Sequence, residues 1–213
     1  MNPARLLRQI WLGLAAKSSA DYWERRYAGG LNSGAGSYGH LAEFKAGVLN
    51  EFVATRAVTD VMEFGCGDGN QLTLARYPKY VGLDVSATAI DLCRQRFAND
   101  SSKSFLQYDP VRTVNLPGML TADLTMSLDV IYHLLEDSVY EMYLQHLFTT
   151  ARRFVIVYSS DTDARHPSRH VRHHPFTLDV AKAFPQFRLI QRLENPHRDD
   201  TFADFYFYER SQS

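Results

Sequence analysis

Three glycines alternate with other residues at Gly65, Gly67 and Gly69, directly after the apolar segment 61–64. Glycine has no Cβ atom, so it adopts positive φ angles and lets backbone amides approach a ligand closely. The spacing differs from the Gly-x-Gly-x-x-Gly and Gly-Lys-Ser/Thr patterns that bind phosphates. The acid Glu63, expected at the rim of this turn, would repel a phosphate and attract a cationic amine. The motif therefore indicates a nucleoside that carries an amino acid, rather than NAD or ATP.

Further acids follow the glycine turn in an order that makes the motif more specific. One apolar run ends in Asp84, a second ends in Asp109, and a third leads into Asp129 and His133. Over about residues 40–160 the series resembles the class I S-adenosylmethionine (SAM)-dependent methyltransferases, whose first motif is Glu/Asp-x-Gly-x-Gly-x-Gly. Several ordered matches are far more specific than one glycine motif.

The resemblance implies that SAM is the cofactor and S-adenosylhomocysteine (SAH) the product. In the family, the acid at Asp84 accepts hydrogen bonds from both ribose hydroxyls, and such a site would repel a 2′-phosphate. Asp109 would accept from the exocyclic amine of adenine, with Tyr108 or Leu106 packed on the ring. The residues implied to bind the cofactor are Glu63, Gly65, Cys66, Gly67, Asp68, Gly69, Asp84, Val85, Tyr108, Asp109, Ser127 and Leu128.

Asp129 and His133 are the candidate catalytic residues. Methyl transfer from a sulfonium has an excellent leaving group, so the protein mainly holds the acceptor in line, and a base is needed only for a protonated acceptor. We expect the two residues at positions i and i+4 of one helix, with both side chains on one face. The carboxylate would raise the basicity of the imidazole and fix its tautomer. Alternatively, His133 only packs or caps, and Asp129 binds the substrate directly.

A polar segment rich in arginine and histidine, residues 160–175, follows the fifth expected strand. Acceptor-binding insertions occur at this place in the fold that the resemblance implies. Arg165, Arg169 and Arg172 would suit a phosphate, sulfate or carboxylate on the substrate. The alternative is an ordinary solvated loop. Tyr38 is a candidate for the opposite wall of the acceptor site, together with Tyr22, Trp23 and Tyr27, which ordinary packing explains about as well.

The same segment carries His166, His170 and His174 at the four-residue spacing of a helical metal site. A continuous helix would be required, and Pro167 and Pro175 bracket the run. No carboxylate or cysteine lies within it to complete a ligand set. We therefore predict no metal site.

Helix and strand patterns alternate along the chain, which predicts a parallel sheet wrapped by helices, with ligands at the carboxyl ends of the strands. The resemblance adds that the last two strands form a hairpin. Together these predict an α/β, Rossmann-like, doubly wound sheet of seven strands, mostly parallel with an antiparallel C-terminal strand and helices on both faces. The expected strands are 61–65, 79–84, 104–107, 122–127, 154–158, 187–193 and 203–208. The expected helices are 40–55, 70–76, 86–97 with Ser86 as N-cap, helices within 129–150, and 177–184.

Residues 1–39 are expected to form an N-terminal helix and a glycine-rich lid, before a methyltransferase domain at 40–213. The loop 28–39 is expected to be mobile because it is rich in glycine, serine and asparagine. The N-terminal helix would cover the domain, with a membrane-surface role or a homodimer contact as alternatives. Its apolar face holds Leu6, Leu7, Ile10, Trp11 and Leu14. No apolar run reaches the roughly 18 residues of a spanning helix.

The composition narrows the class of partner. The sequence has 23 basic and 24 acidic residues and a formal net charge of -1, so no global field would gather nucleic acid or anionic lipid. We expect a small-molecule substrate, with neither nucleic acid nor membrane as a partner. The two cysteines, Cys66 and Cys93, form no disulfide framework or metal-ligand spacing. A reducing cytoplasm is the simplest location.

The segment 127–130 indicates which classes of molecule do not accept the methyl group. It differs from the Asn/Asp-Pro-Pro-aromatic motif of the enzymes that methylate amines of nucleic acids, and it lacks the nucleophilic cysteine that cytosine C5 enzymes use. The leading hypothesis is O-methylation of a hydroxyl on a sugar, nucleoside or natural product. The alternatives are N-methylation of a small molecule, which requires no strong base, and a SAM-binding or partner-binding module without catalysis.

Overall fold

The computed structural model describes residues 16–113 and 115–211. In this part of the chain seven strands form one sheet in the order β3-β2-β1-β4-β5-β7-β6. Strands β1 to β5 are parallel, and β7 runs antiparallel to both β5 and β6. The strands are β1 (Val61–Phe64), β2 (Tyr80–Asp84), β3 (Lys103–Gln107), β4 (Ala122–Leu128), β5 (Ala151–Ser159), β6 (Phe187–Leu193) and β7 (Asp204–Arg210). The predicted fold class, including the antiparallel C-terminal strand, is confirmed.

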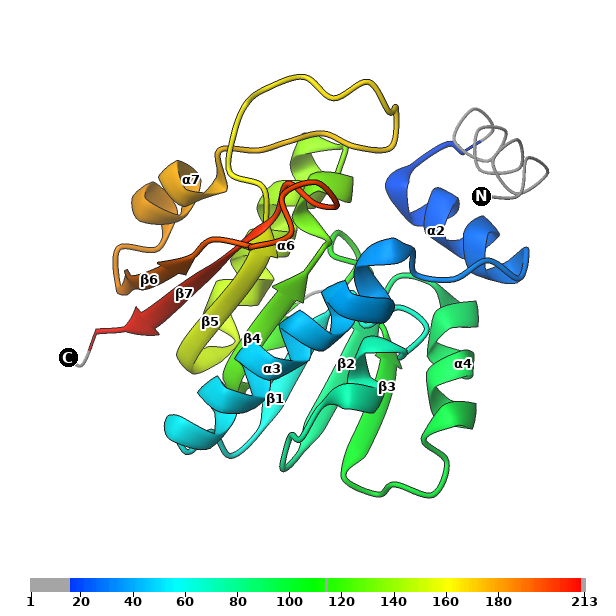
Figure 1. Ribbon diagram of the computed structural model, residues 1–213, viewed down its shortest axis with the longest axis horizontal. Coiled ribbons are helices and arrows are strands. Elements are labelled where there is room, and N and C mark those ends of the chain that lie inside the picture. The colour runs from blue at the N-terminus through cyan, green and yellow to red at the C-terminus, as the bar shows by residue number, and fades with distance from the viewer. Residues whose placement is uncertain (1–15, 114, 212–213) are drawn as a thin grey trace.

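Helices cover both faces of the sheet (Figure 1). Side chains of α3 and α4 belong to the core on one face, and those of α6 and α7 belong to the core on the other. The helices are α2 (Ser19–Ala28), α3 (Gly39–Thr55), α4 (Ala87–Arg96), α5 (Leu116–Met119), α6 (Asp137–Thr149) and α7 (Phe176–Ala183), with 3₁₀ turns η1 (Ala35–Ser37), η2 (Gln71–Leu74) and η3 (Ile131–His133).

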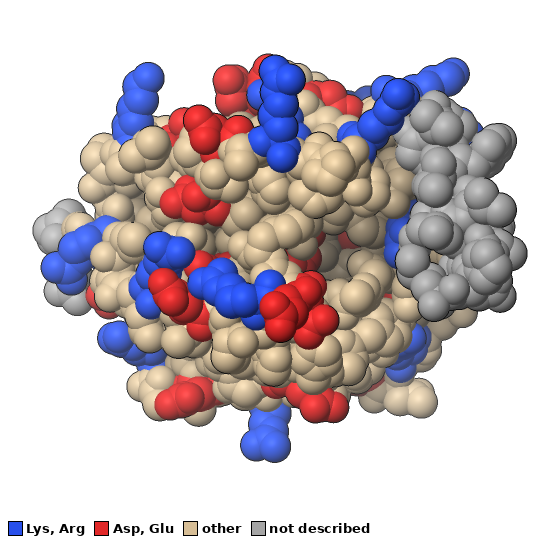
Figure 2. Space-filling view, turned by 45° about the horizontal axis from the view of Figure 1, so that its top comes forward, with Lys and Arg blue, Asp and Glu red and all other residues tan. Residues whose placement is uncertain are grey.

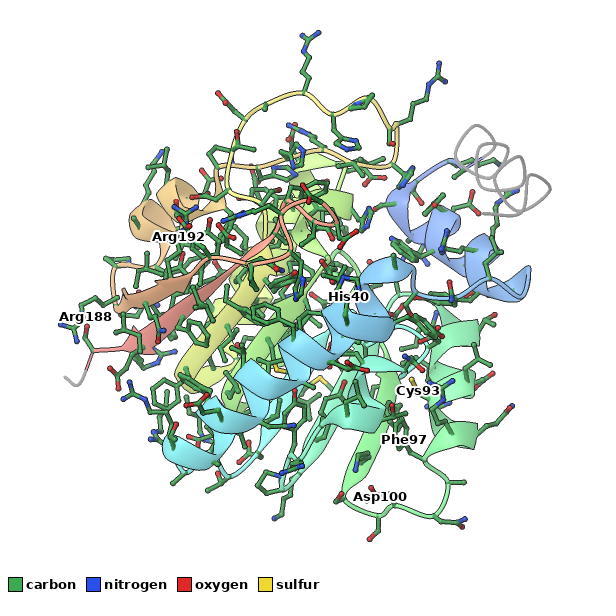
Figure 3. The ribbon with its side chains drawn as sticks, viewed as in Figure 1. His40, Cys93, Phe97, Asp100, Arg188 and Arg192 are labelled. Carbon is green, nitrogen blue, oxygen red and sulfur yellow. The ribbon has the colours of Figure 1, made fainter. Side chains whose placement is uncertain are left out.

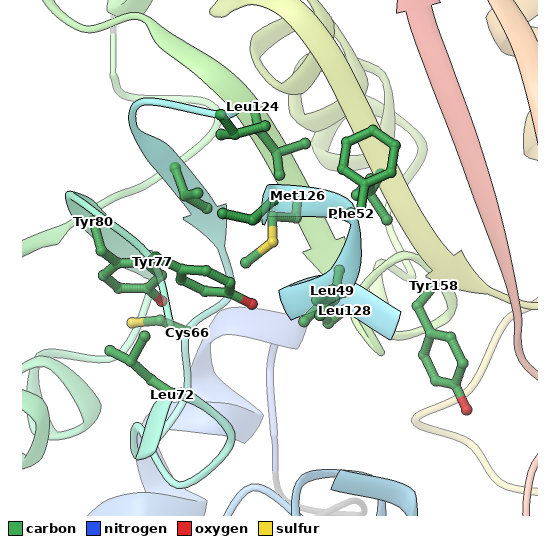
Figure 4. Packing of buried hydrophobic residues seen from close by; sticks show 14 of the residues in the cluster. Leu49, Phe52, Cys66, Leu72, Tyr77, Tyr80, Leu124, Met126, Leu128 and Tyr158 are labelled. Carbon is green, nitrogen blue, oxygen red and sulfur yellow. The ribbon is translucent and has the colours of Figure 1, made fainter. Parts of the chain in front are cut away.

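The central strands are buried along their whole length, because helices cover them on both sides. Every residue of β1 and β4 is buried, as expected for parallel strands with near-continuous apolar runs. Figure 4 shows Leu49 and Phe52 of α3 in one cluster with Met126 of β4 and Tyr158 of β5. Burying each such side chain stabilises the fold by about 1.5–3 kcal/mol. This core fixes the carboxyl ends of the strands relative to α3.

Helix α4 begins where the sequence predicts. The Ser86 side chain accepts a hydrogen bond from the backbone N–H of Ala89 (3.0 Å), which satisfies one of the free amides of the first turn. The prediction of Ser86 as an N-cap is confirmed. Because Ser86 follows β2 directly, this cap holds the start of α4 beside the carboxyl end of that strand.

Two of the expected helices differ from the structure. The helix expected at 70–76 is the short 3₁₀ turn η2, and the chain after β4 forms η3 before α6 begins at Asp137. Asp129 has φ 60°, a left-handed conformation that an α-helix cannot contain. The predicted N-terminal helix lies outside the described residues. Within 16–113 and 115–211, no helix is long and apolar enough to cross a membrane.

Candidate active site

The turn after β1 requires its glycines. Gly65, Gly67 and Gly69 have φ angles of 86°, 57° and 73°. A Cβ atom at Gly65 would lie 2.4 Å from Val130 Cγ2, and one at Gly67 would lie 2.4 Å from Ser33 Oγ. The turn therefore has the positive φ angles that the spacing predicted, and Val130 and Ser33 leave no room for a larger residue at Gly65 and Gly67.

The third glycine of the motif packs against α4. A Cβ atom at Gly69 would lie 2.9 Å from Cys93 Sγ and 3.0 Å from a ring carbon of Phe97. Cys93 lies in α4 and Phe97 is its C-cap residue (Figure 3). The Cys93 thiol also donates to the carbonyl oxygen of Gly67 at 3.2 Å. The role of Gly69 is thus close packing of the turn onto the helix.

Asp84, at the carboxyl end of β2, links the glycine turn to this strand through hydrogen bonds. Its Oδ2 accepts from the N–H of Gly67 and its Oδ1 from the N–H of Ser86, both at 2.9 Å. Burial raises the pKa of Asp84 to about 6, against the lowering effect of these two amides. A carboxylate offers about four lone-pair positions, so two remain for a ligand.

Glu63 is predicted at the rim of the turn but lies buried within β1, with 4% of its surface exposed. Its Oε2 accepts from the hydroxyl of Tyr80 at 2.6 Å. Burial raises the pKa of Glu63 to about 7, although the Tyr80 hydrogen bond and the charge of Lys45 act in the opposite direction. The prediction of its position is wrong because β1 continues as a fully buried strand through this residue.

A first cavity of about 250 Å³ opens at the carboxyl ends of β1, β2 and β4. Most of the residues that the family resemblance implies line it: Glu63, Gly65, Cys66, Gly67, Asp84, Val85, Tyr108, Asp109 and Leu128. Three others, Asp68, Gly69 and Ser127, do not line it. Ser127 lies behind the wall, where its Oγ accepts from the hydroxyl of Tyr143 at 2.7 Å.

The loop after β3 supplies one end of this cavity. Tyr108 lines it and is buried, with its hydroxyl 2.7 Å from Nδ1 of His146. Of the two predicted ring-packing residues, Leu106 is 41% exposed and does not line the cavity. Asp109 Oδ1 accepts from the amides of Val111 and Arg112. Its other oxygen faces Arg112 at 3.5 Å in an exposed ion pair.

Asp129 directly follows β4 and is held by two partners. Its Oδ2 accepts from Lys45 Nζ and its Oδ1 from the hydroxyl of Tyr132, both at 2.6 Å. Lys45, from α3, is 1% exposed and lies 5.1 Å from the centre of the Tyr158 ring. The predicted i, i+4 helical pair of Asp129 with His133 is wrong, because these partners hold Asp129 in its left-handed conformation and only a 3₁₀ turn follows.

Sequence analysis missed Lys45, although its position gave a clue. The apolar stripe of α3 includes Leu41 and Leu49, and Lys45 lies between them at i+4 from Leu41. A lysine on a buried stripe needs a partner for its charge. The sequence did not reveal that the partner is Asp129, 84 residues further along the chain.

His133 is half-buried in η3, and its Nδ1 is hydrogen-bonded to the carbonyl oxygen of His170 at 2.8 Å. A carbonyl only accepts, so Nδ1 carries the proton and Nε2 keeps its lone pair. Burial lowers the pKa of His133 to about 4, the carbonyl contact being too weak to offset it. The imidazole is therefore neutral. Its tautomer is fixed by a backbone carbonyl rather than by the predicted carboxylate.

A second cavity of about 230 Å³ adjoins the first. It lies between α2, the glycine-rich segment 33–36 and η3. Trp23, Ser33, Asp129 and His133 line both cavities. The remaining lining residues are Tyr22, Arg26, Gly34, Ala35, Gly36, Tyr132 and His170. The two cavities thus share one wall, and that wall holds both predicted catalytic residues.

A comparison with known protein families matches the central part of the chain. A family model described as a methyltransferase domain matches residues 61–153, which span the glycine turn, β2, β3 and β4. Residues 61–153 thus resemble a methyltransferase domain, in agreement with the ordered motifs. No curated protein sequence matches the chain.

Solved structures resemble this chain over most of its length. The N-methyltransferase NodS from Bradyrhizobium japonicum WM9, in complex with SAH, has a TM-score of 0.69 at 16% identity and covers 92% of this chain and 100% of its own. Magnesium protoporphyrin IX methyltransferase (ChlM) from Synechocystis PCC 6803, with bound SAM, has a TM-score of 0.65 at 17% identity, covering 92% and 99%. An O-methyltransferase family protein from Burkholderia thailandensis has a TM-score of 0.66 at 12% identity, covering 92% and 60%. At these identities the likeness shows the fold.

The arginines predicted to bind substrate lie outside the linings of both cavities. Arg165, Arg169 and Arg172 are exposed, and none of them lines either cavity. Arg172 donates to the carbonyl oxygen of Leu135 at 2.8 Å and forms an ion pair with Asp137 at 2.7 Å. This arginine closes the loop onto the start of α6.

Tyr38 also lies outside both linings, because its hydroxyl donates to Asp68 Oδ2 at 2.8 Å. Of the aromatic residues considered with it, Tyr22 and Trp23 line the second cavity and Trp23 and Tyr27 line the first. The opposite wall is therefore built by α2 rather than by Tyr38.

The histidines of segment 160–175 have separate partners. His174 Nε2 lies 2.9 Å from the carbonyl oxygen of Leu134, and the His170 ring stacks on Tyr22. Side chains of metal-ligand type do meet elsewhere in the described chain: atoms of His40, His197 and Asp200 lie within 4.8 Å of one another at the surface. His40 stands at the start of α3 (Figure 3), outside both cavities.

Proposed function

We propose that this methyltransferase binds SAM in the first cavity and transfers its methyl group to a small polar molecule in the second. The shared wall of Trp23, Ser33, Asp129 and His133 is the observation that carries the proposal. Because the two cavities share these residues, a donor in one cavity and an acceptor in the other would lie next to each other, and proximity is the main requirement of a methyl displacement.

The residues of the first cavity fit SAM. Asp84 is buried, and it keeps lone pairs beyond its two amide contacts, which suits a ribose diol. Glu63 uses only Oε2 in its bond with Tyr80, so its other oxygen is left to accept from an ammonium group. SAM supplies an electrophilic methyl group on a sulfonium. The protein supplies the acceptors that hold its ribose and its amino group.

A small acceptor agrees with the size and charge of the site. The second cavity, at about 230 Å³, suits a small molecule or part of one. Figure 2 shows basic and acidic side chains mixed over one face, without the continuous basic field that a nucleic acid would require. We place the protein in the cytoplasm, because its two cysteines are free and buried.

The leading acceptor is a hydroxyl, with His133 as the group that takes its proton. The contact of Nδ1 with the His170 carbonyl leaves Nε2 as a proton acceptor in the shared wall. Asp129 is a weaker candidate base, because Lys45 and Tyr132 already donate to its two oxygens. Asp129 and its partners would instead fix the shape of the wall.

One observation favours nitrogen as the accepting atom. Burial lowers the pKa of His133 to about 4, and no carboxylate of the described residues is hydrogen-bonded to its ring. A base this weak assists an alcohol poorly, whereas a neutral amine attacks a methyl group without losing a proton first. N-methylation of a small amine is therefore the second candidate function.

Mass spectrometry after incubation with SAM and a library of small metabolites tests the function. The expected result is one product heavier by a methyl group, together with an equal amount of SAH. If no metabolite gains a methyl group across the pH range in which the protein stays folded, methyl transfer to a small molecule is refuted.

The variant His133→Ala then separates oxygen from nitrogen. With a hydroxyl acceptor we expect turnover to fall by about 10²- to 10⁴-fold, since the variant loses its proton acceptor. With an amine acceptor the rate should change by less than about tenfold. His40→Ala is the control, because His40 lines neither cavity and lies at the start of α3.

A further inference from the structure

Arg26 is a buried cation in the wall of the second cavity. It lies in the last turn of α2 with 5% of its surface exposed. Its Nε donates to the carbonyl oxygen of Asn32 at 2.7 Å and its Nη1 to the hydroxyl of Tyr22 at 3.4 Å. Its guanidinium lies 5.5 Å from the centre of the Trp23 ring. These contacts fix the side chain in one orientation.

None of these partners is an anion. In the part of the chain that the structure describes, Arg26 forms no ion pair and its Nη2 makes no hydrogen bond. An arginine stays protonated under all ordinary conditions. Removing such a charge from water is costly unless a counter-ion is present. Lys45, the other buried cation near the cavities, has its counter-ion in Asp129.

The other groups around this cavity leave the charge of Arg26 unbalanced. Burial lowers the pKa of both His133 and His170, and the nearby charge of Arg26 lowers them further. Both rings are therefore neutral. Asp129, the carboxylate in this wall, already accepts from Lys45 and Tyr132. The cavity thus carries a net positive charge at Arg26.

Space is available beside the free end of the guanidinium. At Gly34 of the loop, a Cβ atom would lie 3.8 Å from Nη2. Because Gly34 has no side chain, none of its atoms occupies that position. A planar guanidinium with a free edge matches the two oxygens of a carboxylate or phosphate.

We propose that the second cavity contains an anion subsite, in which Arg26 binds a carboxylate or phosphate group of a bound reactant. The proposal rests on the proposed function, and it moves anion recognition from the exposed arginines of segment 160–175 to α2. The anionic group has two sources. It is either the methionine carboxylate of SAM, reaching across the shared wall, or an anionic group on the methyl acceptor.

Calorimetry on the full chain distinguishes the sources through two ligands. SAH carries the amino-acid carboxylate, whereas 5′-methylthioadenosine has the same nucleoside and sulfur without it. If Arg26 binds the cofactor, Arg26→Gln lowers the affinity for SAH by at least about tenfold and leaves the affinity for 5′-methylthioadenosine unchanged. Arg25→Gln is the matched control, because Arg25 is the adjacent residue of α2 but is more exposed and is paired with Asp21.

A second titration detects an acceptor anion. Acetate and inorganic phosphate are added to the SAH-saturated protein while tryptophan fluorescence is recorded, since Trp23 lies against Arg26. If Arg26 binds the acceptor, the wild type gives a saturable change that Arg26→Gln loses, and SAH affinity is equal in both proteins. Arg26→Lys keeps the charge without the fork, so an intermediate effect is expected, and it replaces Arg26→Gln if that variant does not fold.

The proposal is overturned if the Arg26 variants match the wild type in SAH affinity and in both anion titrations. A wild type that binds neither SAH nor 5′-methylthioadenosine would contradict the proposed function instead. In that case the anion titrations of the unliganded protein would still test the role of Arg26. The two failures are therefore distinguishable.

Discussion

Glu63 and Asp84 are two buried carboxyl groups in the wall of one cavity. Burial raises the pKa of Glu63 from 4.5 to about 7 and that of Asp84 from 3.8 to about 6. An acid of raised pKa binds its proton more tightly in the folded state than in the unfolded state. At a pH between the unfolded and the folded pKa of either group, the carboxyl group has lost its proton in the unfolded chain but keeps it in the folded protein. The free energy of unfolding of the unliganded protein therefore falls as the pH rises through this range.

The variant Glu63→Gln tests this consequence. It keeps an oxygen to accept from Tyr80 but cannot ionise. We expect the wild type to lose stability from about pH 5 to about pH 7, by at most about 1.4 kcal/mol per pH unit for this one group. The variant should lose less. Denaturant unfolding across this range gives the two slopes, and equal slopes would contradict the assignment of a protonated Glu63.

The same carboxyl group makes ligand binding depend on pH. An ammonium group beside Glu63 favours its ionised form, so binding of SAH should release a proton near pH 6. Calorimetry in buffers that differ in ionisation enthalpy measures that proton directly. Release by the wild type and not by Glu63→Gln is the expected result.

At the scale of elements, the glycine-rich segment before α3 is fastened to the turn after β1. Asp68 Oδ2 accepts from the amide of Ser33 at 3.0 Å and from the hydroxyl of Tyr38 at 2.8 Å. The amide of Asp68 in turn donates to Ser33 Oγ at 3.0 Å. Asp68 and Tyr38, which line neither cavity, thus hold this segment over the wall. The idea that it acts as a lid remains a prediction.

Replacing Asp68 with Ala should release the segment without disturbing the sheet. The loss of these hydrogen bonds, worth about 0.5–1.5 kcal/mol each, should speed amide hydrogen exchange in residues 29–38. SAH should slow the exchange in the wild type and bind more weakly to the variant. Asp91→Ala on the exposed face of α4 is the control. Unchanged exchange in Asp68→Ala would show that other contacts hold the segment.

At the scale of the whole molecule, the sequence predicted the features that depend on local residue patterns, namely strands and the acids near strand ends. Strand 187–193 was predicted at its observed bounds, and the order of acids at strand ends placed Asp84 and Asp109 in one cavity. Parallel strands bring their carboxyl ends to one edge, so such residues converge without any detailed knowledge of packing.

The remaining features depend on contacts between distant parts of the chain. His133 meets the carbonyl of His170, which is 37 residues away, and Lys45 reaches Asp129 across 84 residues. Asp129 and His133 therefore have these distant partners and do not form the expected i, i+4 pair on one helix. Arg26 lies on a helix with basic neighbours, and only the packed fold shows that it is buried. Sequence pattern therefore predicted the lining of the first cavity better than that of the second.

Calorimetric titration of SAH into the wild type and into Asp84→Ala tests the central claim most directly, since it requires no knowledge of the acceptor. The account predicts that the wild type binds and that the variant binds at least about tenfold more weakly, because the diol loses a buried carboxylate. Asp91→Ala should bind like the wild type, and thermal unfolding confirms that both variants are folded. Equal affinity for SAH in folded Asp84→Ala and in the wild type would contradict the placement of SAM in the first cavity.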